Sequence, residues 1–369
     1  MTTGFVWHER YMWHDTGHAS GSAVARGMLQ PGEHFENPET KRRFKNLMDG
    51  YGITDTLTRI PASEAAEEVL LRFHTARYLQ HVKALSDASG GDAGDSAPVG
   101  PGSYAIAALA AGGVIAAMNA VLESKVNNAY ALTRPPGHHA ERDRGRGFCI
   151  FGNVALAAME ALAKRHAERI AIVDWDVHHG NGTQQAFYER DDTLFISLHQ
   201  DQLYPPGSGK VTDTGDGAGD GYTINVPLPP GSGGGAYLTA MDRVVVPALR
   251  AYRPNVVLVS CGFDASCFDP LASMMLTSNH FAAMMEKILA VADDVCNGRV
   301  VAAHEGGYSE SYVPFCGVAT IDAMRGQKSM LVDRSARDTD EGWHALQPHQ
   351  AAMIDGAVAG PLQRLLARV

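Results

Sequence analysis

Two histidines stand side by side in RPPGHHA, the stretch that runs from Arg134 to Ala140. Two prolines precede them and restrict φ, and Gly137 permits an unusual φ, so the backbone of this turn is held in place. Histidine titrates near neutral pH and can act as a general base and then as a general acid. We therefore expect His138 and His139 to be aimed at one water molecule. The alternative is a structural histidine pair.

A second group of titratable residues lies in DWDVHHGNGTQ, which runs from Asp174 to Gln184. Asp176 and His178 are two positions apart, and on an extended segment such side chains face the same way. A carboxylate oxygen and an imidazole nitrogen at one point are a suitable pair of metal ligands. The alternative is a polar strand end whose aspartates cap a helix.

A third carboxylate, Asp264, follows the apolar run VVLVSC, where it is costly to bury without a partner such as a metal ion. With Asp176 and His178 it would leave an open coordination position for water, which is typical of catalytic rather than structural sites. Tyr308 follows two glycines in HEGGYS, and its hydroxyl could hydrogen-bond a developing oxyanion. A lone tyrosine more often serves packing, which is the alternative here.

Buried strands are predicted immediately before these residues. Near-continuous runs of Val, Ile, Leu and Ala are typical of parallel strands covered on both faces, and helical patterns lie between them. This alternation predicts right-handed βαβ units and one parallel sheet, with the polar residues at the carboxyl ends of its strands. The expected strands are 128–134, 169–176, 193–199, 255–264 and 298–307, the expected helices include 154–165, 237–252 and 281–296, and a short strand is expected inside a surface loop over 205–235.

The composition is that of a globular protein with a well-buried core: 369 residues, of which 45% are hydrophobic and 20% charged. A formal net charge of −10 is unlike that of a nucleic-acid binder and would mildly attract a cationic substrate. Five cysteines without C-x-x-C spacing indicate reduced thiols in a cytoplasmic protein. The first residues lack the layout of a signal peptide, which fits the same expectation.

The uncharged stretch Ser103–Leu122 is long enough to span a membrane. It consists mostly of alanine and contains two glycines and an asparagine, which supply little transfer free energy compared with leucine. We therefore expect a buried helix in a protein that has no membrane partner.

Taken together, RPPGHHA, GFCIFGN, DWDVHHGNGTQ, ISLHQ, GFDAS and EGGYS, in this order and spacing, resemble the zinc-dependent histone deacetylase family. The resemblance covers residues 5–320 or so, and is greatest to the class II-like bacterial histone deacetylase-like amidohydrolases and to acetylpolyamine amidohydrolases. It implies an arginase-like α/β fold over residues 1–369 as a single domain. The central sheet would be parallel and eight-stranded with helices on both faces, and a C-terminal helical segment, 340–369, would pack on this core.

The resemblance further implies hydrolysis of an N-acetylated amine to a free amine and acetate, with one catalytic zinc ion. Asp176, His178 and Asp264 would be the zinc ligands, although Fe²⁺ or Co²⁺ could bind the same set. Structural potassium or sodium ions are implied as well. The first of these sites maps to Asp174, Ser197, Leu198 and the carbonyls of Asp176 and His178, and the second maps to carbonyls near Phe187, Arg190, Thr193 and Tyr222.

Catalytic roles are implied in the same way. His139 would be the general base and then the general acid, His138 would assist electrostatically when paired with Asp174, and Tyr308 would stabilise the tetrahedral oxyanion. Asn181 stands where some family members carry an aspartate behind the second histidine. An amide does not stabilise an imidazolium as a carboxylate does, so the pKa of His139 should lie lower than with aspartate there. Weakly active members replace the tyrosine with histidine, and its retention here predicts real activity.

Substrate-binding residues are implied along a narrow tunnel that takes an extended acyl-lysine-like chain. They are Phe148, Tyr204, Gly147, Pro136, Leu271 and the rim residue Asp95. Leu271 occupies the position where the acetylspermidine-specific branch carries a glutamate, which argues against that recognition device. An acetylpolyamine amidohydrolase stays an alternative, with Asp15, Asp92 and Asp95 as candidate acidic residues at the mouth of the tunnel.

Two further interpretations are weaker. A catalytically silent binder of acylated proteins would not need the full set of catalytic residues, and all of them are present. A binuclear manganese ureohydrolase of related fold would need more bridging carboxylates than these motifs supply. The expected partners are therefore an acetylated amine or acetyl-lysine substrate, with no nucleic acid, and relatives suggest a homo-oligomer, either a dimer or a tetramer.

Overall fold

The computed structural model describes residues 2–24, 29–337 and 344–369. Its centre is an eight-stranded sheet in the order β13–β12–β11–β14–β15–β9–β1–β5, in which every neighbouring pair is parallel. The strands are β1 (Thr3–Val6), β5 (Thr58–Ile60), β9 (Asn128–Ala131), β11 (Ile170–Asp174), β12 (Thr193–Gln200), β13 (Thr223–Leu228), β14 (Val256–Cys261) and β15 (Val300–His304). The single α/β domain with a parallel eight-stranded sheet is therefore confirmed.

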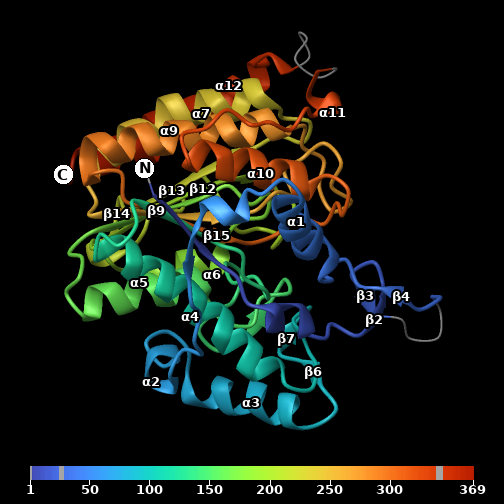
Figure 1. The fold of residues 1–369 in the computed structure, drawn as a ribbon. Coiled ribbons are helices and arrows are strands. Elements are labelled where there is room, and N and C mark those ends of the chain that lie inside the picture. The colour runs from blue at the N-terminus through green and yellow to red at the C-terminus, as the bar shows by residue number, and fades with distance from the viewer. Residues whose placement is uncertain (1, 25–28, 338–343) are drawn as a thin grey trace.

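Helices cover both faces of this sheet, as Figure 1 shows. On one face lie α1 (Glu39–Gly50), α7 (Gly234–Ala240), α8 (Val246–Tyr252), α9 (Ser278–Cys296), α10 (Val313–Met324) and α12 (Pro348–Ala357). On the other lie α3 (Ala76–Asp87), α4 (Ser103–Leu122), α5 (Asn153–Ala163) and α6 (Asn181–Phe187), with the short α2 (Glu67–Leu70) beyond them.

The two layers of helices give two apolar cores, because successive side chains of a strand point to opposite faces. In β14, Val257 and Val259 belong to one core, whereas Val256 and Leu258 belong to the other. All four are fully buried. Each such side chain contributes about 1.5–3 kcal/mol relative to leaving it in water, which is why the strand sequences are continuously apolar rather than alternating.

The alanine-rich helix α4 passes the length and composition test for a membrane span, with a mean hydropathy of 2.1 in its most apolar window. In the structure, 72% of that window is buried against the rest of the chain. A Cβ on Gly112 would lie 1.8 Å from the carbonyl oxygen of Ser63, so the helix approaches a neighbouring segment more closely than any larger residue permits. The expectation of a buried helix is confirmed.

Four strands differ from the sequence-based expectation. The edge strand β5 and its neighbour β1 were not predicted, because three and four residues give too little pattern to recognise. The segment expected to form a short strand within a loop is β13, which pairs along its whole length with β12 and closes the other edge of the sheet. The expected strand 169–176 ends at Asp174, where the side chain accepts a hydrogen bond from Asp176 N at 3.1 Å and the chain turns.

The strand order reverses between β11 and β14. From β11 the chain proceeds outward through β12 to β13, and it then returns to β14 on the other side of β11. Open α/β sheets bind ligands at the carboxyl ends of strands at such a point. The segments that leave β11 and β14 there are the ones that carry Asp176, His178 and Asp264.

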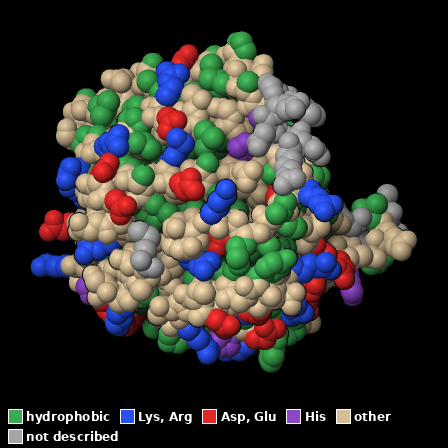
Figure 2. All heavy atoms as spheres, turned by 45° about the horizontal axis from the view of Figure 1, so that its top comes forward, with side chains coloured by type: hydrophobic (Ala, Val, Ile, Leu, Met, Phe, Trp, Pro, Cys, Tyr) green, Lys and Arg blue, Asp and Glu red, His purple; other side chains and the backbone are tan. Residues whose placement is uncertain are grey.

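Smaller elements surround this centre. The short antiparallel strands β2 (His18–Ser20), β3 (Ala23–Val24) and β4 (Gly32–Glu33) form an arm that projects from the body in Figures 1 and 2. Over the face drawn in Figure 2, Lys and Arg side chains are interspersed with Asp and Glu. The other short strands are β6 (Gly91–Asp92), β7 (Gly94–Asp95), β8 (Pro98–Val99) and β10 (Gly145–Arg146).

The C-terminal segment packs on the core as far as it is described. Residues 340–343 of the expected segment 340–369 lie outside the described residues. Beyond them, α12 contacts β13 and α7, and α13 (Gln363–Leu366) contacts α8. Arg364 and Arg368 both form ion pairs with Asp220, at 3.0 and 2.5 Å. Before the gap lies the short helix α11 (Arg334–Arg337).

Candidate active site

The three predicted metal ligands meet at the reversal point of the sheet. His178 Nδ1 lies 3.1 Å from Asp176 Oδ1 and 3.1 Å from Asp264 Oδ2, and all three side chains are buried. Asp176 and His178 lie in the turn after β11 rather than on an extended segment, so the chain bend and not strand periodicity brings them together. In each aspartate, the carboxylate oxygen that does not contact His178 accepts a hydrogen bond from the backbone. Gly306 N donates to Asp176 Oδ2 and Val177 N donates to Asp264 Oδ1, each at 2.8 Å.

This donor set fits a divalent cation. Burial raises the pKa of Asp264 to about 6, and Asp176 adds to that effect. Burial lowers the pKa of His178, but its hydrogen bonds with the two carboxylates outweigh burial and raise it to about 10. The two buried carboxylates beside one imidazole thus favour positive charge at this point. A metal ion bound by all three side chains would provide that charge.

Glycines make room for the cluster. A Cβ on Gly306 would lie 2.3 Å from Asp264 Oδ2 and 2.6 Å from Asp176 Oδ2, and a Cβ on Gly262 would lie 2.2 Å from Asp176 Oδ2. These are closer than any real contact with a Cβ atom. The glycines after β14 and β15 therefore let the backbone form the wall of the cluster.

His138 lies between two carboxylates. Its Nδ1 is 3.0 Å from Asp174 Oδ2, and its Nε2 is 3.6 Å from Asp176 Oδ1. Burial disfavours a charged ring, but Asp176 and Asp174 together hold the pKa of His138 well above its usual range. The pairing with Asp174 that the resemblance implies is thus present, and it favours an imidazolium at this position.

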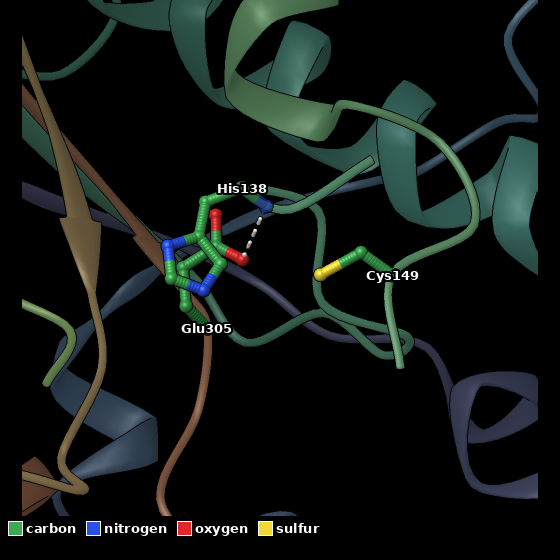
Figure 3. A group of neighbouring side chains, drawn as sticks. All are labelled: His138, Cys149 and Glu305. Atoms are coloured by element: carbon green, nitrogen blue, oxygen red, sulfur yellow. Dashed lines mark hydrogen bonds between the residues drawn. The ribbon is translucent and has the colours of Figure 1, made fainter. Parts of the chain in front are cut away.

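Glu305 anchors the turn that carries this histidine, and sequence reasoning did not select it. Its Oε2 accepts hydrogen bonds from Gly137 N at 2.6 Å and from His138 N at 3.1 Å; Figure 3 shows the second of these. Burial raises the pKa of Glu305 to about 7. The only sequence signal was its position directly after an apolar strand, next to the glycines of HEGGYS.

Glu305, His138 and Cys149 also form a second group whose potential ligand atoms lie within 4.8 Å of one another. Their atoms already have partners in the chain: Cys149 Sγ accepts from His139 N at 3.4 Å and contacts Gly147 O. Figure 3 shows that Cys149 stands apart from the other two side chains. This group therefore supports the histidine turn, and the cluster after β11 and β14 is the better metal site.

His139 has a different environment from its neighbour. Its Nδ1 lies 2.7 Å from Asn181 Oδ1, and its ring lies at the cavity described below. Burial lowers the pKa of His139 well below its usual range, and the adjacent rings of His138 and His178 add to that effect. A neutral imidazole at this position suits a base that takes a proton.

Tyr308 lines the same cavity as His139. Its ring packs edge-on against Phe148 with centroids 5.7 Å apart, and burial raises its pKa well above the usual range, so the hydroxyl is a donor. Its backbone N–H donates to Asp269 Oδ2 at 2.8 Å. Lys41 Nζ lies 5.8 Å from the centre of the Tyr308 ring.

These side chains share one cavity of about 200 Å³. The predicted residues that line it are His139, Gly147, Phe148, His178, Tyr204, Leu271 and Tyr308. Tyr204 packs edge-on against His139 with ring centroids 5.0 Å apart. Phe148 has a φ of 68°, a left-handed conformation that costs about 1 kcal/mol or more in a bulky residue and is held here by the surrounding packing. The cavity is narrow and lined mainly by aromatic and aliphatic groups.

Two predicted substrate residues do not line this cavity. Pro136 is buried in the turn before the histidines, and Asp95 is held outside by a 2.9 Å ion pair with Arg146. Three lining residues were missed in the sequence, namely Ser22, Ser96 and Leu203. Each adjoins a loop without apolar periodicity, so only its neighbours in the sequence could have indicated it.

The other acidic candidates for a polyamine-binding mouth serve local turns. Asp92 Oδ1 accepts from Gly94 N and Ala97 N, and Asp15 Oδ1 accepts from Gly17 N. Among the described residues, no Asp or Glu lines the cavity. None of the three candidate acidic residues, Asp15, Asp92 and Asp95, is part of the cavity lining.

The turn RPPGHH is held differently from the prediction. Gly137 does not adopt a left-handed φ; instead, a Cβ there would lie 2.5 Å from Asn153 N. The turn begins at Arg134, which is fully buried and binds both carboxylate oxygens of Glu36 at 3.0 Å. Lys41 Nζ also binds Glu36, at 2.9 Å. Sequence reasoning did not find this buried cluster, because Arg134 is 98 residues from Glu36.

The residues of the first predicted monovalent-cation site lie at the carboxyl end of β11 and in the adjoining part of β12, whereas those of the second lie around the amino ends of β12 and β13. Asp174 and Ser197 are opposite one another on β11 and β12, and Ser197 Oγ is 2.9 Å from His199 Nδ1. In the second set, the Phe187 carbonyl accepts from Arg190 N and the Tyr222 carbonyl from Phe195 N. Binding of potassium or sodium by Leu198, Thr193 and the other members stays a prediction.

The fold and the site together define a class of protein. A parallel α/β sheet with histidines and carboxylates gathered at its reversal point is the arrangement of the arginase and deacetylase fold. Residues 34–324 match the Histone deacetylase domain family. The chain belongs to the histone deacetylase family, and it is accordingly a hydrolase of the deacetylase and amidohydrolase type.

Individual relatives agree with this membership. The chain is 49% identical to a histone deacetylase-like amidohydrolase of Pseudomonas aeruginosa, over 96% of this chain and 92% of that protein. It is 39% identical to a probable deacetylase of Archaeoglobus fulgidus, over 88% and 87%. Among solved structures, the crystal structure of the HDA15 HD domain superposes with a TM-score of 0.86 at 28% identity, covering 99% of this chain and 96% of that one.

Proposed function

We propose that the protein is a zinc-dependent amidohydrolase that removes acetyl groups from N-acetyl-lysine-like amines. The observation that carries this proposal is the convergence of the metal-ligand cluster, His139 and Tyr308 on one narrow cavity. An amide carbonyl that entered this cavity would meet a Lewis acid, a base and a hydroxyl donor together. Those are the three groups that hydrolysis of an unactivated amide requires.

Asp176, His178 and Asp264 would hold the zinc ion, which when bound supplies a Lewis acid that polarises the carbonyl and lowers the pKa of water. His139 Nε2 is the proton acceptor, because Nδ1 is occupied by Asn181 Oδ1. The same nitrogen returns the proton to the amine that leaves. Asp176 and Asp174 together hold the pKa of His138 well above its usual range, and the resulting positive charge would stabilise negative charge that develops in the cavity.

Tyr308 supplies the hydrogen bond to the oxyanion. Its hydroxyl stays protonated because burial raises its pKa, and Phe148 and Asp269 fix the ring and the backbone. A preorganised donor of this kind contributes about 2.7–4 kcal/mol to the transition state. A silent acyl-lysine binder would have no use for this donor together with a paired base, and the arrangement therefore favours catalysis.

The cavity lining favours an acyl-lysine-like substrate. Phe148, Tyr204 and Leu203 can pack against a chain of methylene groups, and Leu271 stands at the position proposed for polyamine selection. A polyamine carries further ammonium groups along its chain, and these gain from carboxylates that the cavity lining does not include among the described residues. The acetylpolyamine amidohydrolase activity is the second candidate, supported by the net charge of −10.

The test compares hydrolysis of an acetyl-lysine peptide with that of N-acetylputrescine and N-acetylspermidine by the zinc-loaded protein. Metal content is measured in parallel, with Fe²⁺ and Co²⁺ as replacements. We expect the peptide to be preferred and His139→Ala to abolish turnover while zinc stays bound. Preference for the polyamines would instead favour the second candidate, and no turnover of any amide by zinc-loaded protein would contradict the proposal.

A further inference from the structure

The ring of His139 contacts the side-chain amide of Asn181, and that amide in turn contacts the carboxylate of Glu141. Asn181 Oδ1 lies 2.7 Å from His139 Nδ1, and Asn181 Nδ2 donates to Glu141 Oε1 at 2.8 Å. The Glu141 side chain is only 14% exposed. We propose that Glu141 is a positioning residue that holds His139 in its Nδ1–H tautomer by fixing the orientation of the Asn181 amide. This inference rests on the proposed function, to which it adds the residue that prepares the general base.

The orientation of the amide follows from its neighbours. A carboxylate only accepts hydrogen bonds, and the backbone carbonyl of His139, 3.4 Å from Asn181 Nδ2, also only accepts. Turning the amide over would place its oxygen against both acceptors. The NH₂ group must therefore face Glu141, and the oxygen must face the ring. Because that oxygen is an acceptor, His139 Nδ1 carries the proton and Nε2 keeps the free lone pair that a base needs.

Arg146 keeps the Glu141 carboxylate in place. Its Nη1 donates to Glu141 Oε1 at 2.9 Å, the same oxygen that Asn181 uses, and its Nε donates to Asp95 Oδ2 at 2.9 Å. The guanidinium thereby joins the carboxylate behind the base to the predicted rim residue. Arg144 binds the other oxygen of Glu141, but it is 44% exposed, and such surface pairs contribute little.

The same contacts account for the amide at position 181. An aspartate there would bring a second carboxylate to the 2.8 Å contact that Asn181 Nδ2 now makes with Glu141. Like charges at this separation repel strongly unless one of them binds a proton. In this chain the negative charge is therefore on Glu141, which Asn181 separates from the imidazole of His139. Asn181 orients the ring without placing a full charge beside it.

Nitrogen NMR of the zinc-loaded full chain with ¹⁵N-labelled histidine tests this role, and the signals missing in His139→Ala assign the ring. We expect His139 in the wild type to show only the Nδ1–H tautomer. Glu141→Leu removes the acceptor that Asn181 Nδ2 now faces, so the amide can turn either way and we expect a mixture of His139 tautomers. With the base misoriented for part of the time, kcat should fall about 10-fold while KM changes less than about 2-fold.

Arg144→Gln is the matched control, because it removes a cation from the same carboxylate but leaves the Oε1 contact with Asn181 intact. It should keep the wild-type tautomer and kcat. A second pair of variants tests the charge argument: Asn181→Asp should lower kcat, and Asn181→Asp with Glu141→Gln should restore about 10-fold of that loss, since glutamine can donate to the new carboxylate.

The proposal is overturned if Glu141→Leu keeps the wild-type tautomer and kcat, or if the double variant is no better than Asn181→Asp alone. Failure of the proposed function would be distinct from either result. The wild type would then turn over none of the acetylated amines, whereas the NMR tautomer of His139 would still decide the role of Glu141.

Discussion

Asp269 accepts the backbone N–H of Tyr308 through one carboxylate oxygen and the backbone N–H of Leu271 through the other, at 2.8 and 2.9 Å. One buried carboxylate therefore ties the proposed oxyanion donor to a residue of the cavity wall. Neither the order of residues in the chain nor their types indicated this connection. It explains how a hydroxyl that follows two glycines is held in one place.

Asp269→Asn tests this connection. An asparagine offers one acceptor where the carboxylate offers two, so one backbone N–H faces an NH₂ group and loses its partner. We expect kcat to fall about 10-fold and the free energy of unfolding to fall by about 1–3 kcal/mol. Zinc content should stay at the wild-type level, because Asp269 is not part of the ligand cluster. Steady-state kinetics with metal analysis would show this, and unchanged kcat would refute the positioning role.

Glu305 offers a test by graded substitution. Both N–H groups of the histidine turn reach the same oxygen, Oε2, so the carbonyl oxygen of Glu305→Gln can replace it, whereas Glu305→Ala leaves both N–H groups unpaired. We expect the alanine variant to lose about 100-fold in kcat and the glutamine variant to retain much more. Equal losses in the two variants would mean that the negative charge, rather than the hydrogen bonds to Gly137 and His138, is what matters.

Gly306→Ala probes the wall of the metal cluster. The added Cβ would overlap the carboxylates of Asp264 and Asp176, so we expect the variant to lose stoichiometric zinc and all measurable turnover. Gly356→Ala is a suitable control, since nothing lies within 4 Å of a Cβ at that helical glycine. It should keep full zinc content and gain about 0.5–1 kcal/mol in stability. Full zinc occupancy in Gly306→Ala would contradict the close packing described above.

The stability of the protein should fall below neutral pH, partly through His74. Its Nε2 accepts from Gly152 N at 3.0 Å, and its Nδ1 donates to the carbonyl of Glu141 at 3.1 Å, so a second proton has no place. Burial lowers its pKa to about 4. The unfolded chain takes up a proton near pH 6.5 and the folded chain does not, so folding becomes less favourable as pH falls between these values.

Urea unfolding of the wild type and of His74→Gln at pH 7 and pH 5 isolates this contribution. The other buried histidines are common to both proteins. From pH 7 to pH 5 the wild type should lose about 2 kcal/mol more than the variant. An equal loss in the two proteins would show that His74 is protonated in the folded state.

The sequence by itself determined the class of fold and most of the site. Continuous apolar strands such as 255–264 can only be buried on both faces, and this fixes a parallel sheet whose strand ends carry the polar residues. The motif residues Asp176, His178, Asp264, His139 and Tyr308 were selected from their types. The structure gathers the first three in one cluster, and it places His178, His139 and Tyr308 in the lining of one cavity. Local patterns suffice for these because each motif adjoins a strong strand signal.

Tertiary structure alone decided which residues support the site. Glu305, Asp269 and Glu141 act through backbone or amide groups that lie far away along the chain, and no local pattern records such a pairing. The same holds for Pro136 and Asp95, which the resemblance placed along the substrate tunnel although burial and an ion pair hold them elsewhere. Side-chain type reveals what a residue can do, whereas its partners depend on the path of the whole chain.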